Sequence, residues 1–479
     1  MSREALQRYS GKLWREIDRV DPPKRPADER VADFHEIYSL LDETTVREQA
    51  SRCIQCPQPA CQQGCPLSNH IPDWLALAAE GKFLEAATIS QATSNMPEIC
   101  PRVCPQERLC EGSCILVGHA EPICIGAIEK FINEFALAQG GIPVTCAPPN
   151  GRSAAVVGSG PGGLACADEL AKLGYAVTVF EAQSLGGGLL LNGIPAFKLE
   201  KTVVQRRLNI LEQRGVKFRF NVMVGSDVDL HDLLDDFDAV FLGVGAQMAR
   251  PLDIPGAELA GVHQALPFLV QKNSPMALEL PAIPVAGRRV VVLGGGDTAM
   301  DCLRTAVRSG AAEAVCLYRR DLANMPGSRK EYFNAMEESA QFLFLTNPVA
   351  LESDGEGRVA GVRCVQMELG EPDASGRRKP RAVPGSGFCI KADLVLIAYG
   401  FDPVPFPPGS DLATVAVNDW GTIKVDEHQM TNVPGVFAGG DVSRGASLVV
   451  HAVRDGRKAA LGIHRYLTEP AAHKPSARK

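Results

Sequence analysis

Apolar residues along this chain form short runs that alternate with helical periodicities, the pattern of proteins built from β-α-β units. In the clearest stretch, 154–181, an apolar run (Ala154–Val157) leads through a glycine-rich turn and a helical segment to a second apolar run (Ala176–Phe180). The same order of strand, turn, helix and strand returns at residues 288–320. Each stretch therefore predicts two parallel strands joined by a helix.

Other segments have simpler patterns. Ile71–Thr93 has helical periodicity on either side of Gly81, which predicts a helical hairpin. Leu394–Ala398 predicts a buried strand, and Ser447–Gly462 predicts a helix. The polar residues up to about position 50 are rich in helix formers and predict a helical lead-in. The polar, Gly-, Pro- and Arg-rich stretch 371–381 predicts a hairpin that forms a surface loop.

The turn after the first strand carries three glycines at the spacing Gly158-x-Gly160-x-x-Gly163. In dinucleotide-binding folds the first permits the tight turn, the second lets backbone N–H groups approach a pyrophosphate, and the third lets helix and strand pack closely. Glu181 lies where a carboxylate accepts hydrogen bonds from an adenosine ribose. A glycine-rich turn without a ligand is the alternative, but strand, helix and terminal acid are all in register. The predicted cofactor contacts are Gly158, Ser159, Gly160, Pro161, Gly163 and Glu181.

The second glycine-rich turn has Gly294 and Gly296 at the first two positions and Ala299 at the third, which the fingerprint tolerates. Its second strand ends in Arg319-Arg320 rather than in an acid. Guanidinium groups bind phosphate bidentately, whereas a carboxylate would repel it. This site therefore suits the 2′-phosphate of NADP(H), and the first site suits FAD or NAD. A solvated strand end is the alternative reading of the two arginines.

Eight of the fifteen cysteines fall between residues 53 and 114. They form two runs, Cys53-x2-Cys56-x4-Cys61-x3-Cys65-Pro66 and Cys100-x3-Cys104-x5-Cys110-x3-Cys114. Thiolates at such spacings, with a Cys-Pro ending, are typical of bacterial ferredoxins and predict two [4Fe–4S] clusters. Disulfides would need an oxidising compartment, and structural zinc favours paired Cys-x2-Cys knuckles, of which there is only one. The other seven cysteines are scattered, mostly in apolar contexts that predict buried thiols.

Near the end of the chain, the stretch 435–441 places a carboxylate just past a short apolar strand and ahead of a helix. In flavoproteins with two nucleotide sites, an aspartate so placed hydrogen-bonds the ribityl or phosphate region of the flavin. Gly440 and Asp441 are therefore candidate FAD contacts, with a helix N-cap as the alternative role of Asp441. The glycine-rich loop 186–189 is predicted to lie beside the same cofactor and adds Gly188.

Composition narrows the class of protein. The chain has 479 residues, of which 45% are hydrophobic, and a net charge of −7, which argues against a nucleic-acid partner. The N-terminus is too charged for a signal peptide, and no apolar run approaches the roughly 18 residues of a membrane span. We therefore expect a cytoplasmic protein without a membrane partner.

Together these features resemble the small (β) subunit of NADPH-dependent glutamate synthase, from about Arg25 to about Tyr466. The resemblance is carried by KRPADERVADFHEIYSLLDE, both cysteine runs, NGIPAFKLEK, VVVLGGGDTAMDC, YRRDLANMPGS and FAGGDVSRGASLVVHAVRDGR. The same module resembles the N-terminal half of dihydropyrimidine dehydrogenase and related NADPH:ferredoxin reductases. The implied fold is α/β, with an N-terminal α-helical double iron–sulfur domain followed by two Rossmann-like nucleotide-binding domains. The NADPH-binding domain would be inserted into the FAD-binding domain.

The linker signals and this implied fold set the expected domain boundaries. A segment with several prolines and glycines, 141–153, is the clearest linker, and the residues from about 469 are rich in Ala, Pro and Lys. The expected parts are a helical domain with two [4Fe–4S] clusters at 1–140, the linker at 141–153, an FAD-binding domain at 154–285 and 401–470, an NADPH-binding domain at 286–400, and a disordered tail at 471–479.

The resemblance also implies site residues. One cluster would be held by Cys53, Cys56, Cys61 and Cys114. The other would be held by Cys65, Cys104, Cys110 and a fourth ligand at the position of Glu129, where the dehydrogenase has a glutamine; Cys100 or Cys124 could take that place instead. Further implied FAD contacts are Leu189, Lys198 and Val224, and implied nicotinamide-nucleotide contacts are Asp297, Thr298 and Gly400.

The function implied by the resemblance is electron input. Hydride would pass from NADPH to FAD, and electrons would leave through the clusters to a large (α) subunit, which carries the second flavin and the glutaminase site and makes L-glutamate from L-glutamine and 2-oxoglutarate. Hydride transfer needs positioning rather than proton chemistry, so no catalytic acid or base is predicted. Two alternatives remain. A reductase feeding ferredoxin or another acceptor is disfavoured by the lead-in, and a non-catalytic scaffold is disfavoured by the intact glycines, acids and clustered cysteines.

Overall fold

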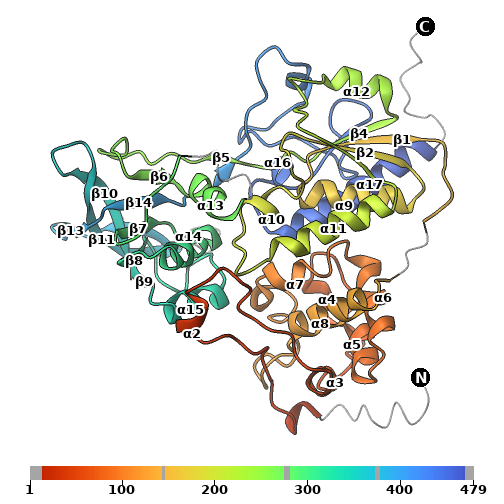
Figure 1. Cartoon of the computed structure of the whole chain (residues 1–479), viewed down its shortest axis with the longest axis horizontal. Helices are drawn as coiled ribbons and strands as arrows, with labels where there is room; N and C mark the ends of the chain where they lie inside the picture. Colours follow the sequence, from red (N-terminus) through yellow and green to blue (C-terminus); the bar gives the residue numbers. More distant parts are fainter. Residues whose placement is uncertain (1–12, 143–145, 275–280, 373–377, 470–479) are drawn as a thin grey trace.

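The computed structural model describes residues 13–142, 146–274, 281–372 and 378–469. The chain has a helical N-terminal part and two further parts, each built on a parallel five-stranded sheet (Figure 1). This architecture confirms the predicted fold class, a helical domain followed by two Rossmann-like domains. The predicted tail at 471–479 lies outside the described residues, as do 143–145 of the predicted linker and 373–377 of the predicted loop.

Helices of the N-terminal part pack around their own apolar core. Helices α5 (Ile71–Ala79) and α6 (Phe83–Thr93) form the predicted hairpin, which turns at Gly81 with φ +79°. Helix α8 (Ile125–Ala138) crosses the hairpin, and its Phe131 ring packs edge-on against Phe83 with centroids 5.0 Å apart. The helices that complete this part are α3 (Glu43–Ser51), α4 (Ala60–Gly64) and α7 (Cys100–Val103).

The lead-in prediction was wrong for most of the residues that the structure describes; residues 1–12 of the lead-in lie outside them. Within residues 13–42 the helical pieces are only η1 (Leu13–Arg15) and α2 (Ala27–Arg30). The Ile37 N–H instead donates to the Phe197 carbonyl oxygen at 3.3 Å, and the Arg30 guanidinium, 1% exposed, reaches Glu338 at 2.8 Å. These contacts with distant parts of the chain replace local helical hydrogen bonds, so tertiary structure overrides the helix propensity of the segment.

The first sheet combines two stretches that are far apart in sequence. Its order is β16-β4-β1-β2-β3, and every pairing is parallel. The strands are β1 (Ser153–Val157), β2 (Ala176–Glu181), β3 (Lys217–Phe220), β4 (Ala239–Leu242) and β16 (Val436–Ala438). Because β16 joins after the chain has passed through the second sheet, the second sheet is inserted into the part that holds the first.

Three helices cover one face of the first sheet: α9 (Pro161–Lys172), α11 (Lys201–Gln213) and α17 (Val449–Thr468) (Figure 1). Helix α17 is the helix predicted at Ser447–Gly462, and it continues to Thr468. None of the described helices combines the length and the apolar character that crossing a bilayer demands.

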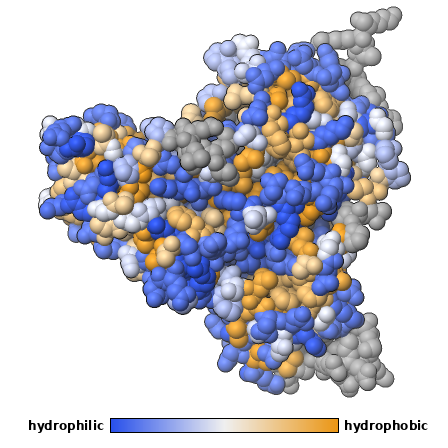
Figure 2. Space-filling view, in the orientation of Figure 1, coloured by the Kyte–Doolittle hydropathy of each residue, from blue (hydrophilic) through white to orange (hydrophobic). Residues whose placement is uncertain are grey.

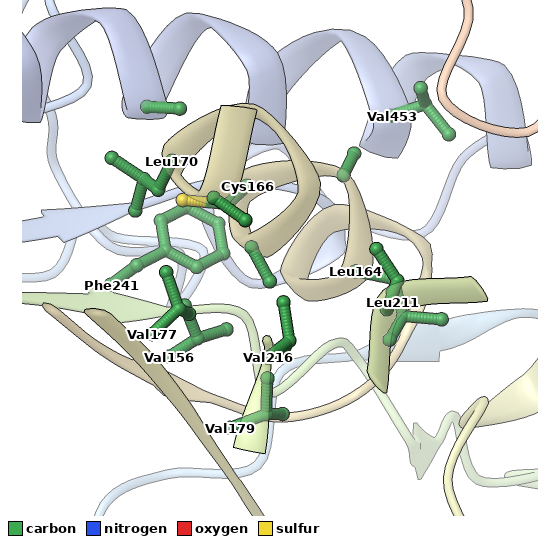
Figure 3. Close-up of a cluster of buried hydrophobic side chains, with 14 of the residues drawn as sticks. Val156, Leu164, Cys166, Leu170, Val177, Val179, Leu211, Val216, Phe241 and Val453 are labelled. Atoms are coloured by element: carbon green, nitrogen blue, oxygen red, sulfur yellow. The ribbon is translucent and has the colours of Figure 1, made fainter. Parts of the chain in front are cut away.

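The core beneath these helices holds the first glycine-rich turn in place. Figure 3 shows strand side chains facing the underside of α9, and the residues that it labels are at most 3% exposed. They are Val156, Val177, Val179, Val216 and Phe241 facing Leu164, Cys166, Leu170, Leu211 and Val453. Five of the seven scattered cysteines are buried, Cys166 among them, which confirms that most of these thiols are core residues.

The second sheet has the order β6-β14-β7-β8-β9, again all parallel. Its strands are β6 (Val262–Gln264), β7 (Arg289–Leu293), β8 (Glu313–Tyr318), β9 (Gln341–Phe344) and β14 (Leu394–Ile397). One face packs against α13 (Ala265–Asn273), α14 (Asp297–Arg308) and α15 (Arg329–Glu337). The other packs against an antiparallel sheet made of β10 (Thr346–Ser353), β11 (Val359–Pro372), β12 (Arg378–Ala382) and β13 (Phe388–Lys391). The predicted strand at Leu394–Ala398 is confirmed as β14.

One domain boundary differs from the sequence expectation. β6 and α13 lie before the predicted boundary at residue 286, yet β6 pairs with β14 and α13 packs into the core of the second sheet. The sequence hides this because β6 has only three residues, all half-buried, and so lacks an apolar run. We propose that the second nucleotide domain begins near Val262.

A buried carboxylate in α9 ties the helical part to the first nucleotide domain. Asp168 is 1% exposed, accepts a hydrogen bond from Asn95 Nδ2 at 2.6 Å, and forms ion pairs with Lys172 at 2.8 Å and with Arg214. Burial alone would raise the pKa of Asp168, but Lys172, Arg214 and Arg207 lower it from 3.8 to about 2.

We predict a pH-dependent stability loss for Asp168→Asn. The folded pKa lies below the unfolded value, so the stabilisation is complete above about pH 4 and is lost as pH falls through about 2. A shift of nearly two pKa units corresponds to about 2.5 kcal/mol. Urea unfolding at pH 7 should show that loss in the variant, and the gap from the native chain should narrow on acidification below pH 4. A gap independent of pH would contradict this role.

Candidate functional site

The first glycine-rich turn joins β1 to α9 and leaves open space at its middle glycine. A Cβ at Gly158 would lie 2.6 Å from the Gly243 carbonyl oxygen, and one at Gly163 would lie 1.9 Å from that of Gly158. A Cβ at Gly160 would meet no atom within 4 Å. The backbone is therefore tightly packed at the outer glycines and faces free space at the middle one. This shape fits a pyrophosphate at the start of α9, where Pro161 is the first helical residue.

Glu181 ends β2 and is held in one orientation by the turn. Its carboxylate accepts hydrogen bonds from the Ser159 N–H and the Gln183 N–H, both at 2.9 Å, and from the Ser159 hydroxyl. The Ser159 oxygen in turn accepts from the Gly187 N–H at 3.0 Å. The structure thus brings the predicted turn and acid together. It also reveals that Ser159 links them to the loop 186–188, which the glycine spacing alone does not indicate.

The remaining residues predicted to contact FAD lie in three different places relative to the first glycine-rich turn. Gly188 packs against the first turn, since a Cβ there would lie 3.1 Å from Gly160 Cα, and Leu189 follows as the first residue of α10 (Leu189–Asn192). Val224 is half-buried in the loop after β3 and packs in the apolar cluster on the opposite face of the first sheet. Lys198 forms an ion pair with Asp301 of α14 at 2.9 Å, a partner 103 residues away that the sequence pattern gave no sign of.

The end of β16 meets the start of α9 from the other side of the turn. A Cβ at Gly162 would lie 3.7 Å from the Gly439 carbonyl oxygen. Gly440 has φ +77°, and Asp441 begins the short helix α16 (Asp441–Arg444) and accepts from the Ser447 N–H at 3.2 Å. Burial raises the pKa of Asp441 to about 7. A half-buried carboxyl next to a phosphate-binding turn suits hydrogen bonding to the hydroxyl groups of a flavin nucleotide.

The second glycine-rich turn, between β7 and α14, repeats the shape of the first. A Cβ at Gly294 would lie 2.3 Å from the Ala398 carbonyl oxygen, whereas one at Gly296 would meet nothing within 4 Å. Asp297 and Thr298 are the first residues of α14, and the Asp297 carboxylate accepts from the Ser328 N–H at 2.9 Å. This turn also fits a dinucleotide pyrophosphate.

Arg319 and Arg320 directly follow β8, as the sequence predicts. Arg319 is exposed, and its charge acts on Tyr399: burial raises the pKa of Tyr399 to about 12, and Arg319 opposes the rise. The Arg320 Nε is buried and has no hydrogen-bond partner among the described residues. Gly400, the residue after Tyr399, accepts a hydrogen bond from the Arg250 N–H at 3.1 Å. An unpaired buried guanidinium nitrogen beside an exposed arginine fits an anionic ligand such as a 2′-phosphate.

The first cysteine group lines one small, mainly apolar pocket. Its members are Cys53, Cys56, Cys61 and Cys114. Burial raises the pKa of Cys53 to about 12 and that of Cys61 to about 11, and neighbouring thiols add to both shifts. Thiols with raised pKa values lose their protons near neutral pH only when a cationic centre such as a metal binds the resulting thiolates. Among the described residues, no three cysteine, histidine or carboxylate groups converge on one point as ligands of a single ion do. In a [4Fe–4S] cluster each cysteine binds a different iron, so ligands around a pocket fit it.

The second cysteine group gathers around Glu129. Cys104 is hydrogen-bonded to Cys100, and Cys65 and Cys110 both interact electrostatically with Glu129. The Glu129 carboxylate accepts hydrogen bonds from Asn69 Nδ2 at 3.0 Å and Ser90 Oγ at 3.1 Å, and burial raises its pKa to about 7. Cys124 instead donates to Gln49 Oε1 at 3.7 Å. Of the alternatives for the fourth ligand, Glu129 and Cys100 therefore lie with this group. The residues fit a second cluster.

Two family models match the chain and together span most of it. Residues 30–141 match the iron–sulfur domain described as dihydropyrimidine dehydrogenase domain II, 4Fe-4S cluster. Residues 152–456 match the pyridine nucleotide-disulphide oxidoreductase family. The first match contains both cysteine groups, and the second contains both glycine-rich turns.

Comparison with individual proteins agrees with these matches. A glutamate synthase [NADPH] small chain from Azospirillum brasilense is 48% identical over 93% of this chain and 94% of its own length. The oxidoreductase AegA of Escherichia coli is 46% identical over 94% of this chain and 70% of its own. The solved structure of FprA from Mycobacterium tuberculosis with NADPH covers 67% of this chain and 85% of its own, at 23% identity and a TM-score of 0.56. That likeness supports the fold alone.

Proposed function

The chain belongs to the family of glutamate synthase [NADPH] small chains, and from that premise we propose that it supplies NADPH-derived electrons to a glutamate synthase large chain. The large chain would use them to make L-glutamate from L-glutamine and 2-oxoglutarate. The chain itself is an NADPH-dependent oxidoreductase that uses FAD and [4Fe–4S] clusters. The observation that carries the proposal is that two dinucleotide turns and two cysteine groups are joined in one chain.

These cofactors have complementary chemistry: NADPH gives two electrons together as hydride, an iron–sulfur cluster takes one at a time, and a flavin can do both. We assign FAD to the first turn, where Glu181 would bind its ribose and Asp441 its ribityl or phosphate region. NADPH is assigned to the second turn, where Arg319 and Arg320 would bind the 2′-phosphate. The task of the protein is to bind and orient these groups and to exclude water.

Packing supports an order for the two cysteine groups. Cys104 of the second group packs against the apolar core of the first sheet, together with Met96 and Ile99. Cys53 and Cys61 of the first group belong to the separate core of the N-terminal helices. Because electron tunnelling weakens steeply with distance, we place the second group on the flavin side and the first group at the exit to the large chain.

The exit surface is apolar. Ile115 and Val117, which follow Cys114 in the chain, are 55% and 49% exposed, and Ile115 also lines the pocket of the first cysteine group. Figure 2 shows hydrophobic residues at the surface over the N-terminal part. We propose that the large chain covers Ile115 and Val117.

Ile115→Glu should therefore weaken binding of the large chain by about tenfold or more, because a charge would be buried in an apolar interface. NADPH-dependent flavin reduction in the isolated chain should not change. Titration of the labelled chain with large chain measures the affinity. Leu461→Glu, which alters an apolar residue of α17 that is 58% exposed, is the matched control. Equal affinities for the two variants would contradict this exit surface.

Reconstitution tests the proposed function. Mixing the chain with a glutamate synthase large chain should produce NADPH oxidation that depends on both L-glutamine and 2-oxoglutarate. Neither chain alone should show it. Glutamate formation by this chain alone, or no coupled NADPH oxidation in the mixture, would contradict the proposal.

A second candidate function is a reductase that feeds ferredoxin or another acceptor. It is favoured by one observation, the 46% identity to AegA, which is named only as an oxidoreductase. Rapid reduction of ferredoxin combined with no coupling to the large chain would favour it. For either function we propose a cytoplasmic location, because no described cysteine forms a disulfide and clustered thiolates need reducing conditions.

A further inference from the structure

The loop between α10 and α11 is docked against the helix that begins the second nucleotide site. Lys198 Nζ lies 2.9 Å from Asp301 Oδ1 and 4.0 Å from Glu331 Oε2. The ring of Phe197, 1% exposed, has the Arg304 Cζ 4.3 Å and the Arg308 Cζ 4.1 Å from its centroid. A loop of the first nucleotide domain therefore contacts one helix, α14, through both an ion pair and stacked guanidinium groups.

All three contacted residues of α14 lie on the face that also carries Asp297. Asp301, Arg304 and Arg308 follow Asp297 at intervals of four, three and four residues, which places them in one line along the helix. The contact with Phe197 and Lys198 thus attaches this face of α14 to the first nucleotide domain. The open turn at Gly296 and Asp297, where α14 begins, is attached with it.

Glu338 binds the guanidinium groups of Arg304 and Arg308, which also contact the Phe197 ring. Glu338 accepts from Arg304 Nε at 2.8 Å, from Arg308 Nη1 at 2.6 Å and from Arg30 Nε at 2.8 Å. Arg30 belongs to the lead-in, which also bonds the Phe197 backbone through Ile37. The lead-in therefore holds both the loop and the arginines of α14.

The ion pair keeps its charge, and the strand pairing between the two nucleotide domains is short. Burial alone would lower the pKa of the Lys198 ammonium, but Asp301 and Glu331 raise it above its ordinary value, so Lys198 stays charged. Where the chain crosses between the sheets, the pairing is only that of β5 (Met248–Ala249) with β15 (Phe401–Asp402). Domains linked by such a short pairing are expected to move unless side-chain contacts such as those of Phe197 and Lys198 hold them.

We propose that Phe197 and Lys198 are positioning residues that fix α14, and with it the NADPH turn, relative to the flavin domain. This inference rests on the proposed hydride transfer from NADPH to FAD. Hydride transfer requires donor and acceptor atoms about 3–3.5 Å apart, and a misplacement of about 1 Å can cost roughly a hundredfold in rate. Phe197 and Lys198 would remove the domain motion that causes such misplacement.

Asp301→Asn tests the proposal, because it removes the ion pair while leaving Lys198 free to contact FAD. Stopped-flow mixing with NADPH should give a limiting rate of flavin reduction lower by about tenfold or more, with NADPH affinity, FAD content and flavin potential nearly unchanged. Phe197→Leu should act in the same direction. The double variant Lys198→Met/Asp301→Asn should be no slower than the slower single variant. Asp354→Asn, which removes an exposed pair with Arg358 in the same domain, is the matched control and should behave as the native chain.

Hydrogen–deuterium exchange supplies a readout that does not depend on turnover. In Asp301→Asn, the amides of residues 194–199 should exchange at least about tenfold faster, while β7 stays protected. Limiting rates within twofold of the native rate, or a slower rate explained wholly by lost FAD or a shifted potential, would overturn the proposal. Failure of the native chain to reduce its flavin with NADPH would instead contradict the proposed function, so the two failures are distinguishable.

Discussion

Cys114→Ala should stop electron delivery to the large chain while leaving NADPH-dependent flavin reduction close to the native rate. Cys114 lines the pocket of the first cysteine group, beside the proposed exit surface. Loss of a residue that merely supports a metal ligand already costs about tenfold to a hundredfold in metal affinity or activity, so loss of a ligand should cost at least a hundredfold. The two rates are measured separately, by stopped-flow flavin absorbance and by coupled NADPH oxidation.

Cys389→Ala is the control for this variant, because Cys389 is an exposed thiol on β13, far from both cysteine groups in sequence. It should support native rates of both steps, with native iron content. If Cys114→Ala delivered electrons as fast as the native chain, the first cysteine group would have no place on the electron route.

Arg319→Ala should raise the KM for NADPH by about tenfold to a hundredfold and leave the KM for NADH nearly unchanged. A charge-assisted hydrogen bond to phosphate contributes about 1.5–3 kcal/mol to binding. NADH has no 2′-phosphate, so its binding does not include this hydrogen bond and should not weaken when Arg319 is replaced. Arg319 is exposed directly after β8, so its replacement should not disturb the core. Steady-state flavin-dependent oxidation of each nucleotide gives both constants.

Arg363→Ala is the matched control, since Arg363 is 57% exposed on β11 of the same domain and forms an ion pair with Glu352 at 3.5 Å. Equal rises of KM for NADPH and NADH in Arg319→Ala would remove the assigned role in coenzyme choice.

The two glycine-rich turns could be predicted from the sequence because their glycines follow a fixed local spacing. Gly163 has no room for a Cβ because of Gly158 in the same turn, and Gly160 and Gly296 face free space where a ligand can approach. The atoms that leave no room at Gly158 and Gly294 belong to distant residues, Gly243 and Ala398, so these two glycines are recognised from the spacing of the fingerprint alone. The hairpin at Ile71–Thr93 was predictable for the same reason, because helical periodicity is a local property.

Contacts between distant residues could not be predicted in this way. Lys198 and Asp301 are 103 residues apart, and Arg30 and Glu338 are 308 apart. No spacing rule connects such pairs, so the helix-prone lead-in folded irregularly around Arg30 against expectation. β6 could not be predicted because its three half-buried residues do not form an apolar run. The association of Cys100 with Cys104 follows from their spacing, because Cys100 begins α7 and Cys104 directly follows it. The presence of Glu129 beside them depends on how α8 packs.

The central claim is that electrons enter at the second nucleotide site and leave through the cysteine groups. Its most direct test is anaerobic rapid mixing of the small and large chains with NADPH, L-glutamine and 2-oxoglutarate. Flavin absorbance is followed in time, and samples frozen during turnover are examined by electron paramagnetic resonance. We predict that the flavin of this chain bleaches at least as fast as glutamate forms and that an iron–sulfur signal appears during turnover. Turnover without any iron–sulfur signal, or NADPH that leaves the flavin oxidised, would contradict the account.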